Sequence, residues 1–168
     1  MNNNKVVLAF SGGLDTSYCV KYLKHDKHLE VHSAIVNTGG FSPSELQEIE
    51  AKAKNLGVAS HIALEETDNY YNKIIKYLIF GNVLKNNTYP LSVSAERIYQ
   101  AIALADYAKK IGAAYIAHGS TGAGNDQVRF DLVFQLIAPE IEIITPIRDQ
   151  KLSRQEEIEY LAQHGVNI

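Results

Sequence analysis

The sequence predicts a doubly wound α/β domain, in which a five-stranded parallel sheet is covered by helices on both faces. Three observations predict it: short apolar runs alternate with segments of helical periodicity, the helical segments carry capping signals, and glycine-rich loops follow two of the strands. Strands separated by helices imply right-handed crossovers between parallel neighbours. The expected fold is Rossmann-like, so a ligand is expected at the carboxyl ends of the strands.

Length and composition are those of one globular domain. The 168 residues, 46% of them hydrophobic, are enough to bury a core without disulfides, and the single Cys19 cannot form one within the chain. The net charge of −3 gives no general attraction for nucleic acid. The apolar run at 6–10 is too short for a signal peptide or a membrane span. We therefore expect a cytoplasmic protein with neither nucleic acid nor membrane as partner.

The elements follow one another in a regular order. Each expected strand is a short apolar run, often rich in β-branched residues, and the strands span 5–10, 30–36, 60–64, 114–117 and 141–145. The expected helices span 15–24, 43–56, the first part of 67–84, 95–111, a segment from 125 or 126 that carries Val128, Leu132 and Leu136, and 154–164. The stretch 86–90 is expected to be a loop from its composition.

Capping signals mark the starts of two of these helices. Ser42 is placed as an N-cap, Pro43 takes the first helical position, and Glu45 completes a capping box. Ser153 and Glu156 repeat the same box before the last helix. These signals fix where the second and the last helix should begin.

The first glycine-rich loop, SGGLDTS at 11–17, directly follows the first strand. Two adjacent glycines let the backbone approach an anion, and the free N–H groups of the next helix favour negative charge there. The hydroxyls of Ser11, Thr16 and Ser17 add donors for phosphate oxygens. The alternative is a plain glycine turn in which Ser11 and Asp15 only cap the helix.

This loop differs from two widespread nucleotide loops, because it lacks the lysine of G-x-x-x-x-G-K-[ST] and the third glycine of G-x-G-x-x-G. Amides and hydroxyls without a lysine suit a diphosphate that departs as a leaving group. SGGLDTS resembles the pyrophosphate loop, or PP-loop, of the ATP-pyrophosphatase family, whose members attack the α-phosphate of ATP and release pyrophosphate. That resemblance leaves ureido, amide and carboxylate groups and tRNA bases open as acceptors.

The second loop, HGSTGAGNDQVRFD at 118–131, follows the fourth expected strand. Arg129 can grip a carboxylate with two hydrogen bonds, and Asp126 can receive an ammonium group, so the loop suits an amino acid. The alternative is a mobile loop in which Asn125 or Asp126 caps the next helix and Arg129 forms a surface ion pair. His118 either touches a nucleotide or satisfies a backbone carbonyl.

The second loop resembles a signature of argininosuccinate synthase, the ligase of arginine biosynthesis that joins citrulline to aspartate. The resemblance extends from Val6 to about Gly165 and includes Arg97. It implies ATP-binding positions at Ala9, Phe10, Ser11, Gly12, Gly13, Leu14, Asp15, Thr16, Ser17, Val36 and Gly119. It implies citrulline-binding positions at Tyr89, Ser94, Asn125 and Arg129, and aspartate-binding positions at Thr121, Asn125 and Asp126.

The resemblance also implies a reaction in two steps. The ureido oxygen of citrulline attacks the α-phosphorus of ATP to give citrullyl-AMP and pyrophosphate, and the amine of aspartate then displaces AMP. Neither step requires a protein nucleophile, so no catalytic residue is assigned, and alignment and charge stabilisation are expected to carry the rate. Mg²⁺ is expected on the ATP phosphates, with no metal site made of protein ligands alone.

The family implies a second domain, so 1–168 is expected to be an ATP-binding domain that is inactive alone. The whole enzyme is expected to be a homo-oligomer, a tetramer, and this domain a monomer. Departures from the family pattern at 37–40 and 98–100 leave a modified citrulline open as the substrate. Another adenylating enzyme with the same loop and a non-catalytic ATP-binding module are the other hypotheses.

Overall fold

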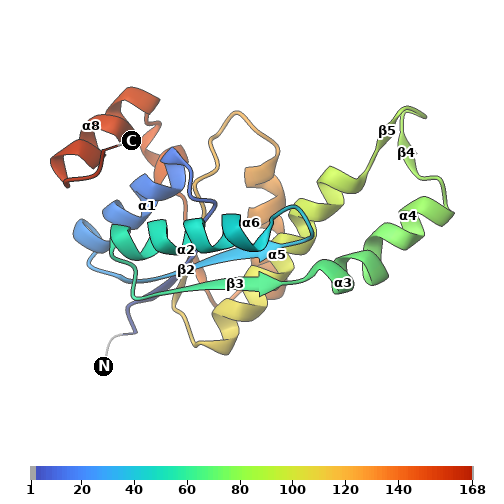
Figure 1. Ribbon diagram of the computed structural model, residues 1–168, viewed down its shortest axis with the longest axis horizontal. Coiled ribbons are helices and arrows are strands. Elements are labelled where there is room, and N and C mark those ends of the chain that lie inside the picture. Colours follow the sequence, from blue (N-terminus) through green and yellow to red (C-terminus); the bar gives the residue numbers. More distant parts are fainter. Residues whose placement is uncertain (1–2, 168) are drawn as a thin grey trace.

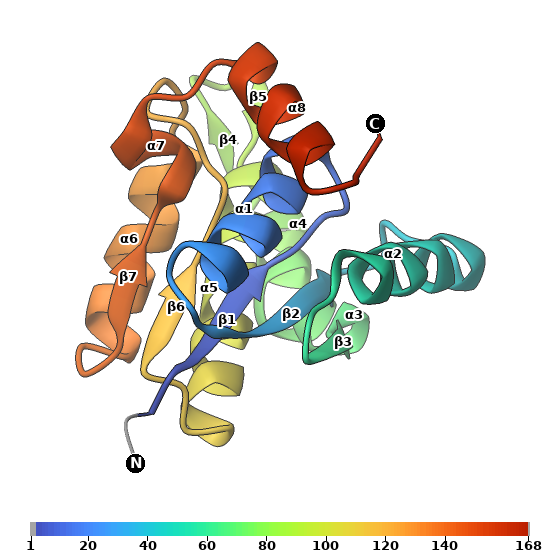
Figure 2. The same ribbon diagram turned by 90° about the vertical axis from the view of Figure 1, so that its left-hand side faces the viewer.

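The computed structural model describes residues 3–167, so residues 1, 2 and 168 of the predicted domain lie outside the described range. Within that range five parallel strands form one sheet in the order β3-β2-β1-β6-β7, which confirms the predicted fold class (Figures 1 and 2; Figure 2 labels all five strands). The strands are β1 (Lys5–Ala9), β2 (Glu30–Asn37), β3 (Ser60–Glu65), β6 (Tyr115–Ala117) and β7 (Glu142–Ile144). No end of a strand differs from its predicted position by more than one residue.

Helices cover both faces of this sheet because β1 alternates its side chains between two cores (Figure 2). Val6 and Leu8 pack with residues of α1, α2 and α8, whereas Val7 packs with residues of α5 and α6. These helices are α1 (Leu14–His25), α2 (Pro43–Leu56), α5 (Ser92–Lys110), α6 (Asp126–Ile137) and α8 (Arg154–Gln163). The central strand is therefore buried on both faces, as expected for a parallel sheet.

Both predicted capping boxes are confirmed. The Ser42 hydroxyl accepts from the Glu45 backbone N–H, and the Glu45 carboxylate accepts from the Ser42 backbone N–H at 2.8 Å. Ser153 and Glu156 make the same pair of bonds at the start of α8. The predicted end of α2 at Gly57 is confirmed as well, since this glycine has φ = 90°.

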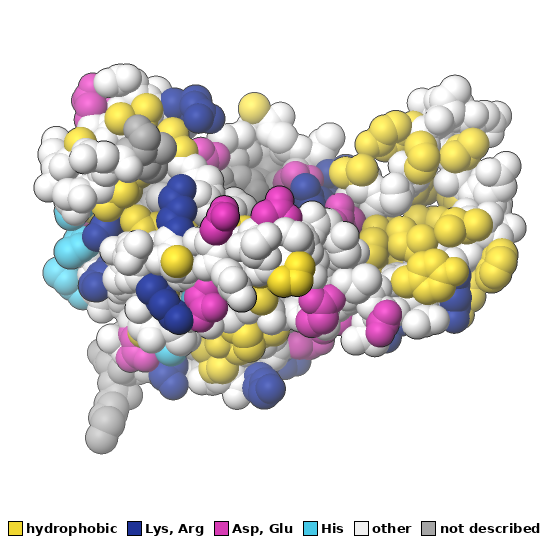
Figure 3. Space-filling model, viewed as in Figure 1, with side chains coloured by type: hydrophobic (Ala, Val, Ile, Leu, Met, Phe, Trp, Pro, Cys, Tyr) yellow, Lys and Arg dark blue, Asp and Glu magenta, His cyan; other side chains and the backbone are white. Residues whose placement is uncertain are grey.

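The chain between β3 and α5 forms an arm, residues 67–91, that projects from the body of the domain (Figure 1). Its outgoing limb consists of α3 (Thr67–Tyr70), a π-helical segment η1 (Tyr71–Ile75) and α4 (Lys76–Phe80). This limb confirms the prediction that the first part of 67–84 is helical. Figure 3 shows hydrophobic side chains gathered on the arm, and Phe80, the last residue of α4, is 83% exposed.

The prediction of a loop at 86–90 is confirmed for residues 86–88, which form a turn, and is wrong for Tyr89 and Pro90, which form a strand. A hairpin forms there from β4 (Leu84–Lys85) and β5 (Tyr89–Pro90), which pair antiparallel. Asn86 and Asn87 turn the chain with φ of 54° and 58°, a conformation that asparagine tolerates better than most residues. The polar residues that suggested a loop therefore form the tight turn between the two strands of this hairpin.

Two further elements complete the body. α7 (Pro146–Gln150) begins directly after β7 and was not predicted; Pro146 ends the strand as expected and also starts this helix. In α6 the buried side chains are Phe130, Val133 and Phe134. The apolar residues singled out from the sequence, Val128, Leu132 and Leu136, are all more than half exposed.

None of the helices formed by residues 3–167 combines the length and the apolar character that a bilayer crossing requires. Within the same range, no three side chains of His, Cys, Asp or Glu come together as metal ligands would.

Candidate functional site

A cleft of about 630 Å³ lies at the carboxyl ends of β1, β2 and β6. The chain leaves β1 toward β2 on one side, while β6 pairs with β1 on the other side, so the cleft lies where the strand order reverses. Doubly wound sheets bind ligands at this point, and the volume is in the range of small-molecule sites. The cleft therefore lies where the fold class predicts a ligand.

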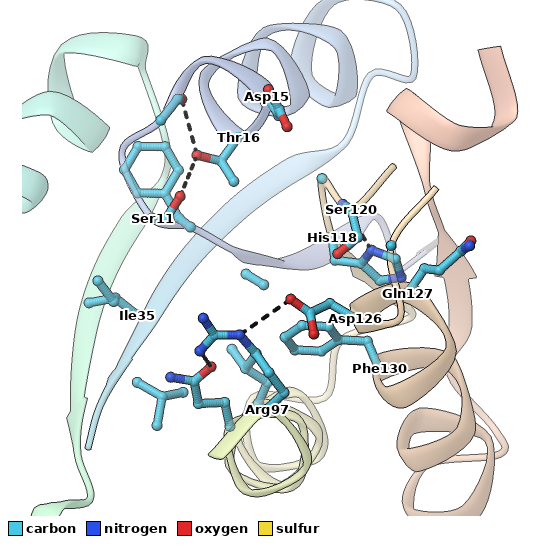
Figure 4. Close-up of a pocket in the computed structure, with 18 of the residues that line it drawn as sticks. Ser11, Asp15, Thr16, Ile35, Arg97, His118, Ser120, Asp126, Gln127 and Phe130 are labelled. Atoms are coloured by element: carbon cyan, nitrogen blue, oxygen red, sulfur yellow. Dashed lines mark hydrogen bonds and ion pairs between the residues drawn. The ribbon is translucent and has the colours of Figure 1, made fainter. Parts of the chain in front are cut away.

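The first glycine-rich loop forms one wall of the cleft (Figure 4). Helix α1 has Gly13 as its N-cap, with φ = −77° and ψ = 177°, so the alternative of capping by Ser11 or Asp15 is wrong. The preceding Gly12 has φ = 79°, which glycine adopts without strain. Ser11 lies 3.4 Å from Thr16, oxygen to oxygen, and both line the cleft.

Helix α1 presents its first N–H groups toward the cleft, since Gly13 and Leu14 line it. An anion is stabilised at such a helix start by hydrogen bonds and by the helix dipole. The hydroxyls of Ser17 and Thr16 both donate to the carbonyl of Gly13, at 2.8 Å and 3.2 Å. Of the three residues predicted to offer hydroxyls, Ser11 and Thr16 line the cleft and Ser17 does not.

The two glycine-rich loops meet at Gly119. A Cβ atom at this position would lie 3.4 Å from the backbone carbon and from the Cβ of Asp15, so a side chain there would crowd the first loop. Glycine at 119 allows this close approach. The predicted nucleotide positions on the two loops are therefore brought together.

His118, at the end of β6, lies at the root of the second loop and is 1% exposed. Its Nδ1 accepts from the backbone N–H of Ser120 at 3.2 Å, so its Nε2 carries the proton and donates to Asp131 at 2.9 Å. Burial lowers the pKa of His118 below its ordinary value, against the opposing charge and hydrogen bond of Asp131. The imidazole is thus neutral and holds the loop, and it also lines the cleft.

A network of charged residues joins α5 to α6 beside the cleft. Arg129 donates to Asp126 at 2.7 Å and to the hydroxyl of Ser94 at 3.1 Å. Arg97 pairs with the other oxygen of Asp126 at 3.4 Å, and both of these residues line the cleft (Figure 4). The pair predicted for an amino acid, Asp126 and Arg129, is therefore joined in one network that reaches the cleft wall.

Asn125 takes the N-cap position of α6, yet none of the described side chains makes a capping bond there. The capping role considered for Asn125 is thus not observed.

The predicted site residues divide into three groups. The cleft is lined by Ala9, Phe10, Ser11, Gly13, Leu14, Asp15, Thr16, Val36, Gly119, Thr121 and Asp126. Gly12, Ser17, Ser94, Asn125 and Arg129 adjoin these residues in the chain or through the hydrogen bonds above. Tyr89 lies on the arm, half exposed, at β5 (Figure 1).

Other residues at the cleft were not identified from the sequence. Arg154, the first residue of α8, and Phe41, in the β2–α2 loop, both line it. Lys52 of α2 donates to the carbonyl of Gly12, so an ammonium group contacts the first glycine-rich loop, which contains no lysine. These residues come from segments distant in the sequence, and no local motif predicts that they lie at the cleft.

Fold and site together define a doubly wound α/β domain with a glycine-rich loop and a helix start at the switch point of its sheet. A family model described as "Arginosuccinate synthase N-terminal HUP domain" matches residues 5–167. The chain belongs to this family.

Curated relatives agree with this assignment. The chain is 42% identical over 168 residues to an argininosuccinate synthase of Dictyoglomus turgidum; the aligned residues cover 100% of this chain and 42% of that protein. It is 42% identical, with the same two coverages, to that of Lactococcus lactis subsp. cremoris. It is 41% identical over 162 residues to that of Methanocaldococcus jannaschii; the aligned residues cover 96% of this chain and 40% of that protein. The chain thus spans about two fifths of the length of these relatives.

Proposed function

We propose that the chain is the nucleotide-binding part of an ATP-dependent ligase that joins citrulline and aspartate to argininosuccinate, with release of AMP and pyrophosphate. The observation that carries the proposal is the meeting of two glycine-rich loops, from adjacent strands, over one cleft at Gly119 and Asp15. The names of the relatives support the choice of reaction.

MgATP is the proposed nucleotide substrate, with the magnesium ion carried on the phosphates. The N–H groups of α1 with the hydroxyls of Ser11 and Thr16 would hold the diphosphate that leaves. Arg97 and Arg154 on the cleft walls would balance its charge. The apolar faces of Phe41 and Val36 suit the purine ring.

The amino acids would bind beside the phosphates, on the second loop and its neighbours. A guanidinium such as that of Arg129 can grip a citrulline carboxylate, and Ser94 and Asp126 already hold it in place. Thr121, Asn125 and Asp126 offer acceptors and donors for aspartate. Because Arg129 is held before any ligand arrives, little side-chain freedom would be lost on binding.

The proposed reaction forms and breaks two bonds in sequence. The ureido oxygen of citrulline attacks the α-phosphorus, and the bond to pyrophosphate breaks. The amine of aspartate then attacks the ureido carbon, and the carbon–oxygen bond to AMP breaks. The two loops would align the reactants and stabilise the charge that develops, which are the largest contributions expected when no protein nucleophile takes part.

The remaining length of the relatives is proposed to supply the second domain and the oligomer contacts of the whole enzyme. The arm supports this, because it exposes apolar side chains such as Tyr77, Ile79 and Phe80. It also carries Tyr89, a proposed citrulline residue that needs a partner surface to reach a ligand. The complete citrulline pocket would thus form between the arm and the second domain.

The test of the proposed function is exchange of labelled pyrophosphate into ATP. We expect exchange that depends on citrulline when the chain is joined to the remaining part of a relative, and little exchange with the chain alone. Exchange without citrulline, or only with another acceptor, would point to a different adenylating enzyme. ATP binding with no exchange under either condition would point to a non-catalytic module.

Arg129→Ala is expected to weaken citrulline binding by at least about tenfold in the joined protein, while the affinity for ATP is kept. The reason is that the bidentate partner of the carboxylate is lost, whereas the first loop is untouched. Calorimetric titration with each ligand measures both effects. Val128→Ala, on the exposed face of the same helix, is the matched control. Citrulline binding like that of the wild type would remove Arg129 from the site.

A further inference from the structure

Arg148, from the short helix α7, lies behind the second glycine-rich loop and makes two hydrogen-bonded connections toward it. One guanidinium nitrogen, Nη1, donates both to Asp131 and to Gln127, and its distance to the Gln127 oxygen is 3.1 Å. Asp131 and Gln127 both belong to α6. The guanidinium thus joins the end of the sheet to the helix that follows the loop.

Each connection continues to a different backbone atom of the loop. Asp131 accepts from His118, whose other ring nitrogen accepts the N–H of Ser120 at 3.2 Å. Gln127 donates through its side-chain nitrogen to the carbonyl of Gly122 at 2.7 Å. A single arginine is thereby connected to one N–H and one C=O of a loop that is otherwise rich in glycine.

The electrostatics of this network agree with its geometry. Although burial opposes it, the hydrogen bonds from His118 and Arg148 hold the pKa of Asp131 below its ordinary value. The Asp131 carboxylate therefore stays charged and receives two donors, and charge-assisted bonds of this kind are stronger than neutral ones. The charges that face His118 are those of Asp131 and Asp149, which favour its protonated form, and that of Arg148, which opposes it.

We propose that Arg148 is a positioning residue that fixes the conformation of the second glycine-rich loop, 119–125, over the cleft. The loop carries Gly119 and Thr121 on the cleft wall, but its own glycines give it little rigidity. Arg148 does not line the cleft, so it acts through Asp131 and Gln127 rather than on a ligand. The positioning role itself does not depend on the proposed function; only the identity of the ligands beside the loop rests on it.

Amide hydrogen exchange of the chain without ligand tests the positioning role directly. In Arg148→Met we expect exchange in 119–125, and at Ser120 above all, to accelerate by at least about tenfold, while exchange in β1 and β2 is unchanged. Lys151→Met, which removes an exposed positive charge three residues away, is the control and should leave the loop unchanged. Unchanged exchange in the loop, or equal acceleration in β1, would overturn the proposal.

The pKa of His118, measured by NMR titration, provides a second test, because it depends on the charge of Arg148 and not only on the packing of its side chain. Removing the cation in Arg148→Met should raise the pKa of His118, whereas Asp131→Asn should lower it. An unchanged titration in both variants would contradict the connection between these residues. Arg148→Lys keeps the charge without the planar fork, so we expect the His118 titration to be restored but the loop exchange to be only partly slowed.

Ligand titration separates this proposal from the proposed function. If the function holds, Arg148→Met should weaken ATP binding several-fold. If wild-type ATP binding is absent but the loop exchange still accelerates in Arg148→Met, the proposed function fails and the positioning role stands. If ATP binds and neither loop exchange nor His118 titration responds, the positioning role fails alone.

Discussion

Gly13→Val is expected to weaken ATP binding by this chain sharply while leaving it folded. The backbone at Gly13 is extended, with φ = −77° and ψ = 177°, and valine adopts this conformation readily. A Cβ atom there meets the Ser11 hydroxyl at 3.5 Å, an ordinary contact, and because Gly13 lines the cleft we expect the added side chain to extend into it. It would then cover the N–H groups at the start of α1, and affinity should fall on the order of 100-fold.

Two other glycines make this experiment specific. Gly40→Val adds the same side chain where nothing lies within 4 Å of the new Cβ, and it should bind ATP like the wild type. Gly12→Val places a β-branched residue at φ = 79°, so it should lower the melting temperature. Calorimetric titration with MgATP and thermal melting measure the two properties. Unchanged affinity in a folded Gly13→Val protein would refute the assignment of this loop to pyrophosphate.

Glu157→Gln is expected to stabilise the chain at alkaline pH. Glu157, in α8, is 2% exposed, and one of its carboxylate oxygens has no hydrogen-bond partner among residues 3–167. Burial and the neighbouring Asp15 raise its pKa to about 7, and Arg154 acts in the opposite direction. Cys19 is the other titratable group that faces it from α1.

The sign of the effect follows from the protons bound in each state. Between the ordinary pKa of a glutamate and about 7, the folded chain keeps the Glu157 proton and the unfolded chain releases it, so stability falls as the pH rises through this window. Above that window the buried charge costs up to about 3 kcal/mol, which glutamine avoids. Below pH 4 both states are protonated, and the stabilities of the two proteins should be similar.

Urea unfolding at pH 5 and pH 8.5 measures this difference. Glu159→Gln makes the same charge change at an exposed position of the same helix, and its pH profile should follow that of the wild type. A Glu157→Gln protein whose stability changes with pH as the wild type does would show that Glu157 titrates normally.

The strands and most helices could be predicted because their signals are local. The capping boxes at Ser42 and Ser153 each depend on residues within three positions of one another, and both were found. Helix α6 was harder to interpret because its sequence is apolar on most sides. Val128 and Leu132 fit helical spacing as well as Phe130 and Phe134 do, and only packing against α5 decides which face is buried.

The candidate site could be predicted where it consists of continuous loops, and not where it depends on tertiary packing. The first loop was found because glycines, hydroxyls and a helix start occur together in seven residues. Arg154 and Lys52 reach the same region from α8 and α2, and nothing in their neighbourhoods distinguishes them from surface cations. The connection of Arg148 to the second loop is of the same kind, since it passes through three side chains.

The parallel register of β1 and β6 determines where this domain tolerates added residues. Leu8 lies opposite Ala117, so the two loops leave neighbouring strands at matched heights. One inserted residue in β1 would advance the first loop by about 3.3 Å relative to the second and reverse the faces of the side chains that follow. The turn at Asn86 and Asn87 lies at the end of the arm, outside this constraint. In the chain alone, labels and insertions should therefore be tolerated at that turn, whereas the length of β1 is fixed.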